Sequence, residues 1–162
     1  MMYQKKPQRK MQKKQMLYLY MAFLAALSIS VFLMPIGIEI ADRTRILTYL
    51  SGVMFWVSLA GTISIALFIT YKRKKSKEFA NDNSGRKRWG IIHFFQNRPA
   101  IISDVLLFVS LIGFIITRVL SETTIFPFVF LSLFIFSFGM HCMLNGSNYN
   151  YINYQKRSVT EP

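Results

Sequence analysis

Two ionisable side chains lie inside apolar segments of this chain, and they are the residues best placed for chemistry. Asp104 and His141 each stand a few residues from the end of a long apolar run. Ionisable residues at membrane depth are costly, and they commonly mark ion pathways, proton relays or buried pairs. An aspartate beside a histidine suits proton transfer, a structural hydrogen bond or, with a further ligand, metal binding.

Helical spacing predicts which side chains share a face with His141. Ser137, His141 and Asn145 follow one another at intervals of four residues, so they lie on one face of a helix. Asp104 comes five residues after Pro99, about 7 Å along a neighbouring helix that runs the opposite way. The sequence therefore predicts one polar cluster, formed by Asp104, His141, Asn145 and Ser137.

Four interpretations of this cluster remain open from the sequence. Asp104 lies near the positive end of its helix and His141 near the negative end of its own, so each is stabilised by the helix dipole without a partner. Alternatively, the two side chains form a structural hydrogen bond that locks their helices together. A proton relay or substrate site is the third interpretation. A metal site completed by His93 is the fourth, although no paired-histidine spacing supports it. We favour the two structural interpretations and expect no metal and no cofactor.

Covalent catalysis is not indicated by the one cysteine. Cys142 directly follows His141, and adjacent residues of a helix point about 100° apart, so the two do not form a nucleophile–base pair. A single cysteine also excludes an intrachain disulfide. A membrane enzyme with its site at the cytoplasmic edge is therefore the least favoured class of function.

Four long apolar runs position these residues. They span residues 16–38, 46–71, 100–117 and 123–144. Each is close to or above the roughly 18–20 residues that cross a bilayer core as a helix, and a helix satisfies its own backbone groups in lipid. The sequence therefore predicts an all-α integral membrane protein with four transmembrane helices. The first run is too long for a cleaved signal peptide and is predicted to be a retained signal anchor.

The distribution of charge predicts the orientation. The chain has 162 residues and a net charge of +13, with 20 Lys and Arg residues. All but three of them lie in residues 1–15, 72–99 and 145–162, and the exceptions are Arg43, Arg45 and Arg118. By the positive-inside rule, the two terminal tails and the middle loop face the cytoplasm. The prediction is a multi-pass protein of the cell membrane, built from two hairpins at residues 16–71 and 100–144.

The middle loop mixes cations with large apolar side chains. Arg86, Lys87, Arg88 and Trp89 are followed by isoleucine and phenylalanine residues at positions 91–95. Such a segment suits the bilayer interface, with its cations on anionic lipid headgroups or on an acidic partner. A basic chain can also indicate nucleic acid, but a loop this short holds no nucleic-acid-binding module, so none is expected.

Small residues predict how the helices pack. One stripe lies in the second run (Ser51, Ser58, Gly61, Thr62) and another in the third (Ser103, Ser110, Gly113, Thr117). Because small side chains let membrane helices approach closely, we expect both stripes to face other helices. The phenylalanine-rich faces of the fourth run should meet lipid. Four helices are enough for a compact bundle, and Gly146 is a natural residue to end the last one.

These features favour a non-enzymatic subunit or accessory protein of a membrane complex. It would act in the lipid bilayer by packing against other membrane helices, from its own copies or from another protein. The alternative is a small oligomeric transporter or channel in which Asp104 and His141 line a pathway near the cytoplasmic face.

Overall fold

The computed structural model describes residues 8–39, 45–76, 90–120 and 125–153, and within these residues it contains helices and connecting coil but no strand. Four long helices, α1 (Gln8–Glu39), α2 (Arg45–Lys75), α4 (Arg98–Leu120) and α5 (Ile125–Leu144), are followed by the short α6 (Ser147–Asn153). Each long helix contains a segment long and apolar enough to cross a membrane. The predicted class is therefore confirmed to this extent: the described residues form an all-helical protein with four helices long and apolar enough to span a membrane.

The helices continue past the apolar runs at their polar ends. α1 begins at Gln8, inside the basic segment 1–15, and α2 ends in four consecutive cations, Lys72 to Lys75. Cations in the last turn of α2 interact favourably with the helix dipole, so they support the helix there. Hydrophobicity thus marks the part of each helix that suits lipid, but it does not mark where the helix ends.

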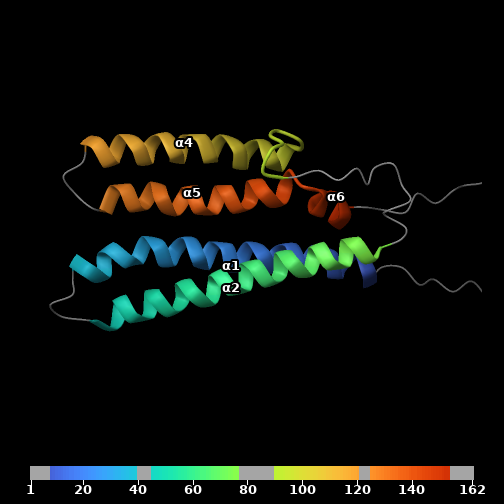
Figure 1. The fold of residues 1–162 in the computed structure, drawn as a ribbon, viewed down its shortest axis with the longest axis horizontal. Coiled ribbons are helices and arrows are strands. Elements are labelled where there is room, and N and C mark those ends of the chain that lie inside the picture. Colours follow the sequence, from blue (N-terminus) through green and yellow to red (C-terminus); the bar gives the residue numbers. More distant parts are fainter. Residues whose placement is uncertain (1–7, 40–44, 77–89, 121–124, 154–162) are drawn as a thin grey trace, which may run out of the picture.

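The four long helices lie in an open row. The long helices in extensive contact are α1 with α2, α1 with α5, and α4 with α5. The order across the row is therefore α2, α1, α5, α4, as Figure 1 shows. This is more open than the compact bundle that we expected, because α2 and α4 lie at opposite edges. Each edge helix has one long helix beside it along its length, and its outer side is left to the surroundings.

One end of each long helix lies beside α6, at the same end of the row. Lys13, near the start of α1, donates from Nζ to the Tyr151 carbonyl of α6 at 3.3 Å. Thr70, near the end of α2, accepts a hydrogen bond from Asn148 Nδ2 at 3.1 Å. α4 starts and α5 ends at this same end of the row (Figure 1). We call it the α6 end.

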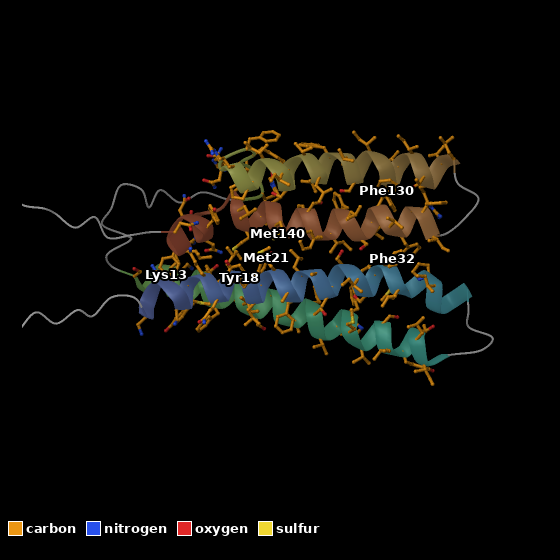
Figure 2. The ribbon with its side chains drawn as sticks, turned by 180° about the vertical axis from the view of Figure 1, so that it is seen from behind. Lys13, Tyr18, Met21, Phe32, Phe130 and Met140 are labelled. Atoms are coloured by element: carbon orange, nitrogen blue, oxygen red, sulfur yellow. The ribbon has the colours of Figure 1, made fainter. Side chains whose placement is uncertain are left out.

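The largest group of buried apolar side chains lies toward the α6 end. Its members come from α1, α2, α4, α5 and α6, and they are Tyr20, Leu24, Leu27, Ile69, Ala100, Met140, Met143, Leu144, Tyr151 and Ile152. Figure 2 shows Met140, a member of this core, and Met21, which packs against the core, between α1 and α5. The core therefore joins the two halves of the row at the end where α6 crosses them.

Hydrogen bonds and small residues hold α1 against α5. Ser28 Oγ donates to the Ser132 carbonyl at 2.6 Å, and Ser132 Oγ donates to the Ser28 carbonyl at 2.8 Å. Gly139 leaves the space that the Leu24 side chain fills, and the Tyr20 hydroxyl donates to the Gly139 carbonyl at 2.9 Å. Close packing and interhelical hydrogen bonds are the interactions that associate helices in lipid, where hydrophobic burial gives little preference.

The small-residue stripes face neighbouring helices, as predicted. Ser51, Ser58 and Thr62 are buried on α2, and the ring of Phe23 on α1 packs directly against Gly61. Ser103 and Ser110 are likewise buried on α4.

The expectation that the phenylalanine-rich faces of α5 meet lipid is wrong in part. Phe126 and Phe138 are exposed, but Phe130 packs against Gly113 between α4 and α5 (Figure 2). Because Gly113 has no side chain, it provides the space for that ring. Phe130 therefore packs against α4, and not in lipid, because the facing residue is a glycine.

Candidate functional site

Asp104 and His141 meet at the α6 end, between α4 and α5. Asp104 lies in the second turn of α4, and His141 lies three residues before the end of α5. The distance from His141 Nδ1 to Asp104 Oδ1 is 2.7 Å. The exposed fractions of the two side chains are 0% for Asp104 and 1% for His141. The structure therefore places this pair out of contact with solvent and lipid.

Asn145 joins the pair from the residue after α5. Its Nδ2 donates to both carboxylate oxygens of Asp104, at 2.9 Å to Oδ1 and 3.2 Å to Oδ2. Its backbone N–H continues the helical pattern by donating to the His141 carbonyl at 3.0 Å. Because Asn145 and His141 are four residues apart, both side chains contact the Asp104 carboxylate.

Ser137 lies on the same face of α5 but takes no part in these bonds. Its hydroxyl donates to the Leu133 carbonyl at 2.8 Å, and it lies 3.4 Å from the Ser110 hydroxyl of α4. A serine in a helix readily bonds to the carbonyl four residues earlier, which satisfies it locally. The cluster that the structure assembles is therefore Asp104, His141 and Asn145, which we call the polar clasp.

Residues 90–97 cover the polar clasp, which no sequence pattern predicts. We call them the roof segment; it is the coil before α4 in Figure 1. The Phe95 N–H donates to Asp104 Oδ2 at 2.6 Å, and the Gln96 N–H donates to Asn145 Oδ1 at 3.1 Å. Asn97 Nδ2 donates to the Leu144 carbonyl at 2.9 Å, which ties the start of α4 to the end of α5.

The roof segment also contacts one face and one edge of the His141 ring. The ring of Phe94 lies over it with a centroid distance of 4.4 Å. His141 Nε2 lies 3.4 Å from the Ile91 carbonyl oxygen. Among the residues of the roof segment that make these contacts, only Asn97 could be recognised from the sequence. It directly precedes α4, and asparagine is favoured at the position before a helix. The path of the coil over the clasp has no such signal.

The backbone of the roof segment is constrained at Phe95 and Gly90. Phe95 has φ = 57°, which is unfavourable for a residue with a Cβ and persists where surrounding contacts require it. The N–H groups of Phe95 and Gln96 supply those contacts. A Cβ on Gly90 would overlap the Cys142 carbonyl. Gly90 is therefore needed for the close approach of the coil to the end of α5.

Gly146 serves a different purpose from the predicted one. α5 ends at Leu144, close to where a glycine cap would end it. However, no glycine among the described residues has a positive φ, so Gly146 is not a left-handed cap. A Cβ there would lie 3.0 Å from the Cys142 carbonyl oxygen and 3.5 Å from Gly90 N. The physical requirement at Gly146 is thus space for the roof segment.

Three nitrogen atoms surround the two side-chain oxygens of Asp104. Its two oxygens accept from the Phe95 N–H, from Asn145 Nδ2 and from His141 Nδ1. The two ring nitrogens of His141 face oxygen atoms, Asp104 Oδ1 and the Ile91 carbonyl oxygen. The clasp therefore meets the requirement that polar groups buried away from water be hydrogen-bonded.

The polar groups of the clasp are bonded to one another and to the roof segment. Among the described residues, each buried side-chain nitrogen or oxygen has a hydrogen-bond partner. His141 directs its nitrogens to Asp104 and Ile91, so it does not activate Cys142. No three His, Cys, Asp or Glu side chains in the described ranges could hold a metal ion, and the set of His93, Asp104 and His141 therefore does not form. The predicted headgroup contacts, Arg86, Lys87, Arg88 and Trp89, lie outside the described residues.

No protein-family model, curated protein or solved structure matches this chain. Its function is therefore inferred from its own residues.

Replacing Gly90 with alanine should open the roof segment, because the new Cβ meets the rigid Cys142 carbonyl. We expect Gly90→Ala to destabilise the protein by about 2 kcal/mol, as other overpacked sites do. Gly52→Ala on α2 is the matched control, since nothing lies within 4 Å of its Cβ position. Unfolding in mixed detergent micelles measures both variants. Equal stability of the two would contradict the close approach.

Removing either Asp104 or His141 should leave the other side chain buried without its hydrogen-bond partner. A buried polar group left unsatisfied costs about 1–3 kcal/mol or more, so we expect Asp104→Asn and His141→Gln each to be strongly destabilising. The double variant should be less destabilised than the sum by about 1–3 kcal/mol. Ser137→Ala is the control on the same face of α5, and its loss should stay below about 1 kcal/mol. Additive losses in the same unfolding assay would show that the pair is not coupled.

Proposed function

We propose that this protein is a non-enzymatic subunit or accessory protein of a cell-membrane complex. Its four spanning helices form two hairpins, with both termini and the middle loop in the cytoplasm. The charge distribution supports this orientation, because residues 1–15, 72–99 and 145–162 hold 17 of the 20 Lys and Arg residues. The gathering of four helix ends around α6 is compatible with it, since all of these basic segments adjoin that end.

The closed state of the polar clasp is the observation that carries the proposal. A transport site must exchange its ion or substrate with water, so its polar groups need access from outside the protein. Asp104, His141 and Asn145 are at most 2% exposed, and they bond to one another and to the roof segment. Such a closed cluster supports a structural role that fixes α4, α5 and the roof segment. The alternative, a small oligomeric transporter, has no observation that favours it.

The open row supports a protein that works by contact with other membrane helices. The outer side of α2 exposes Val53, Trp56 and Val57, and the outer side of α4 exposes Val105 and Ile112. Neither side has a long helix of this chain against it. The occupant that we propose is a helix of another membrane protein on the outer side of α2, with lipid on the outer side of α4.

The proposed orientation predicts which introduced cysteines react from outside. In a Cys142→Ser background, Thr123→Cys should react with a membrane-impermeant maleimide on intact cells, because it lies in a predicted outer loop. Ser84→Cys should react only after the cells are permeabilised. Labelling of Ser84→Cys on intact cells would reverse or refute the proposed topology.

The subunit proposal predicts a specific protein crosslink and no transport. Photoreactive residues at Val57 on α2 and Ile112 on α4 should differ: position 57 should give a discrete adduct to another membrane protein, and position 112 should give only lipid adducts. The purified chain in proteoliposomes should conduct ions and protons no faster than empty vesicles. A flux that Asp104→Asn abolishes would support the transporter instead. Adducts that contain only this chain would show self-association and contradict the proposed partner.

A further inference from the structure

The roof segment presents polar groups inward and apolar side chains outward. Its inward backbone groups include the N–H groups of Phe95 and Gln96 and the carbonyl of Ile91, all directed at the polar clasp. Its outward side chains include Ile91, Ile92 and Phe95, with exposed fractions of 58%, 72% and 51%. The segment therefore has an apolar outer surface on a backbone that is held by the protein.

This outer surface is continuous with the outward side of α4. The ring of Phe94 stacks on that of Phe108, one further turn along α4 from Asp104, with 5.6 Å between centroids. The first turns of α4 expose Ile101, Ile102 and Val105, so apolar side chains extend from the roof segment into the membrane-spanning helix. Any molecule that packs against the first turns of α4 can therefore also contact the roof segment.

Irregular backbone is tolerated at membrane depth only where its polar groups are satisfied by the protein. The clasp provides this satisfaction for Phe95, Gln96 and Ile91 at the level of the second turn of α4. Burial of phenylalanine and isoleucine side chains among the acyl chains next to the headgroups is favourable in free energy. Exposure of the same side chains to water is not. Lipid is therefore the occupant that fits the outer surface, because the surface continues the lipid-facing side of a spanning helix.

We propose that the roof segment is seated in the lipid interface at the α6 end, and that the Asp104 carboxylate holds it there. The binding partner is the lipid of that leaflet, recognised through the apolar side chains of residues 91–95. Asp104 acts by accepting the Phe95 N–H, which keeps the coil folded over the clasp with its side chains outward. This inference does not depend on the proposed subunit role, because it requires only that α4 crosses a membrane.

Tryptophan fluorescence tests the seating directly in the full chain. The two native tryptophans are first replaced by Trp56→Phe and Trp89→Phe, and Ile92→Trp is then added as the probe. The protein is reconstituted in phosphatidylcholine–phosphatidylglycerol vesicles whose acyl chains carry bromine either near the headgroup or near the chain end. Val109→Trp, on the exposed side of α4 and deeper along it, is the matched control.

The probe at position 92 should be quenched most by bromine near the headgroup and little by aqueous acrylamide. The control at position 109 should be quenched most by the deeper bromine. Strong acrylamide quenching without quenching by either lipid would overturn the seating. A blue-shifted probe that neither agent quenches would also overturn it, because protein and not lipid would then cover the surface.

The role of Asp104 is tested by adding Asp104→Asn to the same probe. Asparagine replaces one acceptor oxygen with a donor, so the coil should be released and acrylamide quenching at position 92 should rise about twofold or more. Position 109 should not change if α4 remains inserted. Asn145→Ala removes the acceptor of the Gln96 N–H and the Nδ2 bonds to Asp104, but it keeps the Asp104 oxygen that accepts the Phe95 N–H. It should give an intermediate rise and serves if Asp104→Asn does not fold. A probe that stays seated in the variant that folds would refute anchoring by the clasp, although the seating itself would stand.

Discussion

A carboxylate inside a membrane protein requires hydrogen-bond donors in place of water. Asp104 obtains them from three parts of the chain: a histidine on α5, an asparagine just after α5, and a backbone N–H of the roof segment. The penalty for burying an unpaired ion is several kcal/mol, so none of these donors can move away without loss. This requirement fixes the packing of α4 on α5 and the path of the coil that precedes α4. It also accounts for the unfavourable backbone of Phe95 and for glycine at position 90.

The rest of the fold is held by weaker and more local interactions. In the open row, each contact between neighbours depends on a small residue opposite a large one, as with Gly61 and Phe23, Gly113 and Phe130, or Gly139 and Leu24. Paired serines on α1 and α5 add hydrogen bonds across the middle of the row. These interactions suffice in lipid, because the outer sides of α2 and α4 need no protein cover there. The structure is thus tightly constrained at the α6 end and open along its edges.

The meeting of Asp104 and His141 was predictable because helical geometry is regular. Their distances from the helix ends placed both side chains at one depth, and the four-residue spacing placed Asn145 beside His141. The same geometry put Ser137 on that face, yet its hydroxyl bonds to its own helix and to Ser110. Spacing therefore predicts which side chains are near one another, but competition between acceptors decides which of them bond. Gly146 was identified as a special position for the wrong reason, since its requirement comes from a distant coil.

The sequence by itself determined the helical class, the four membrane-spanning segments and the depth of the two ionisable residues. These follow from hydrophobicity and helical periodicity, which are properties of neighbouring residues. Only the tertiary structure decided that the helices form an open row, that Phe130 fits against Gly113, and that the roof segment closes over the clasp. These depend on contacts between residues far apart in the chain, such as Phe95 with Asp104 and Gln96 with Asn145. A coil has no periodic pattern to record its path, so its position appears only when its backbone donors meet the carboxylate and amide oxygens that accept them.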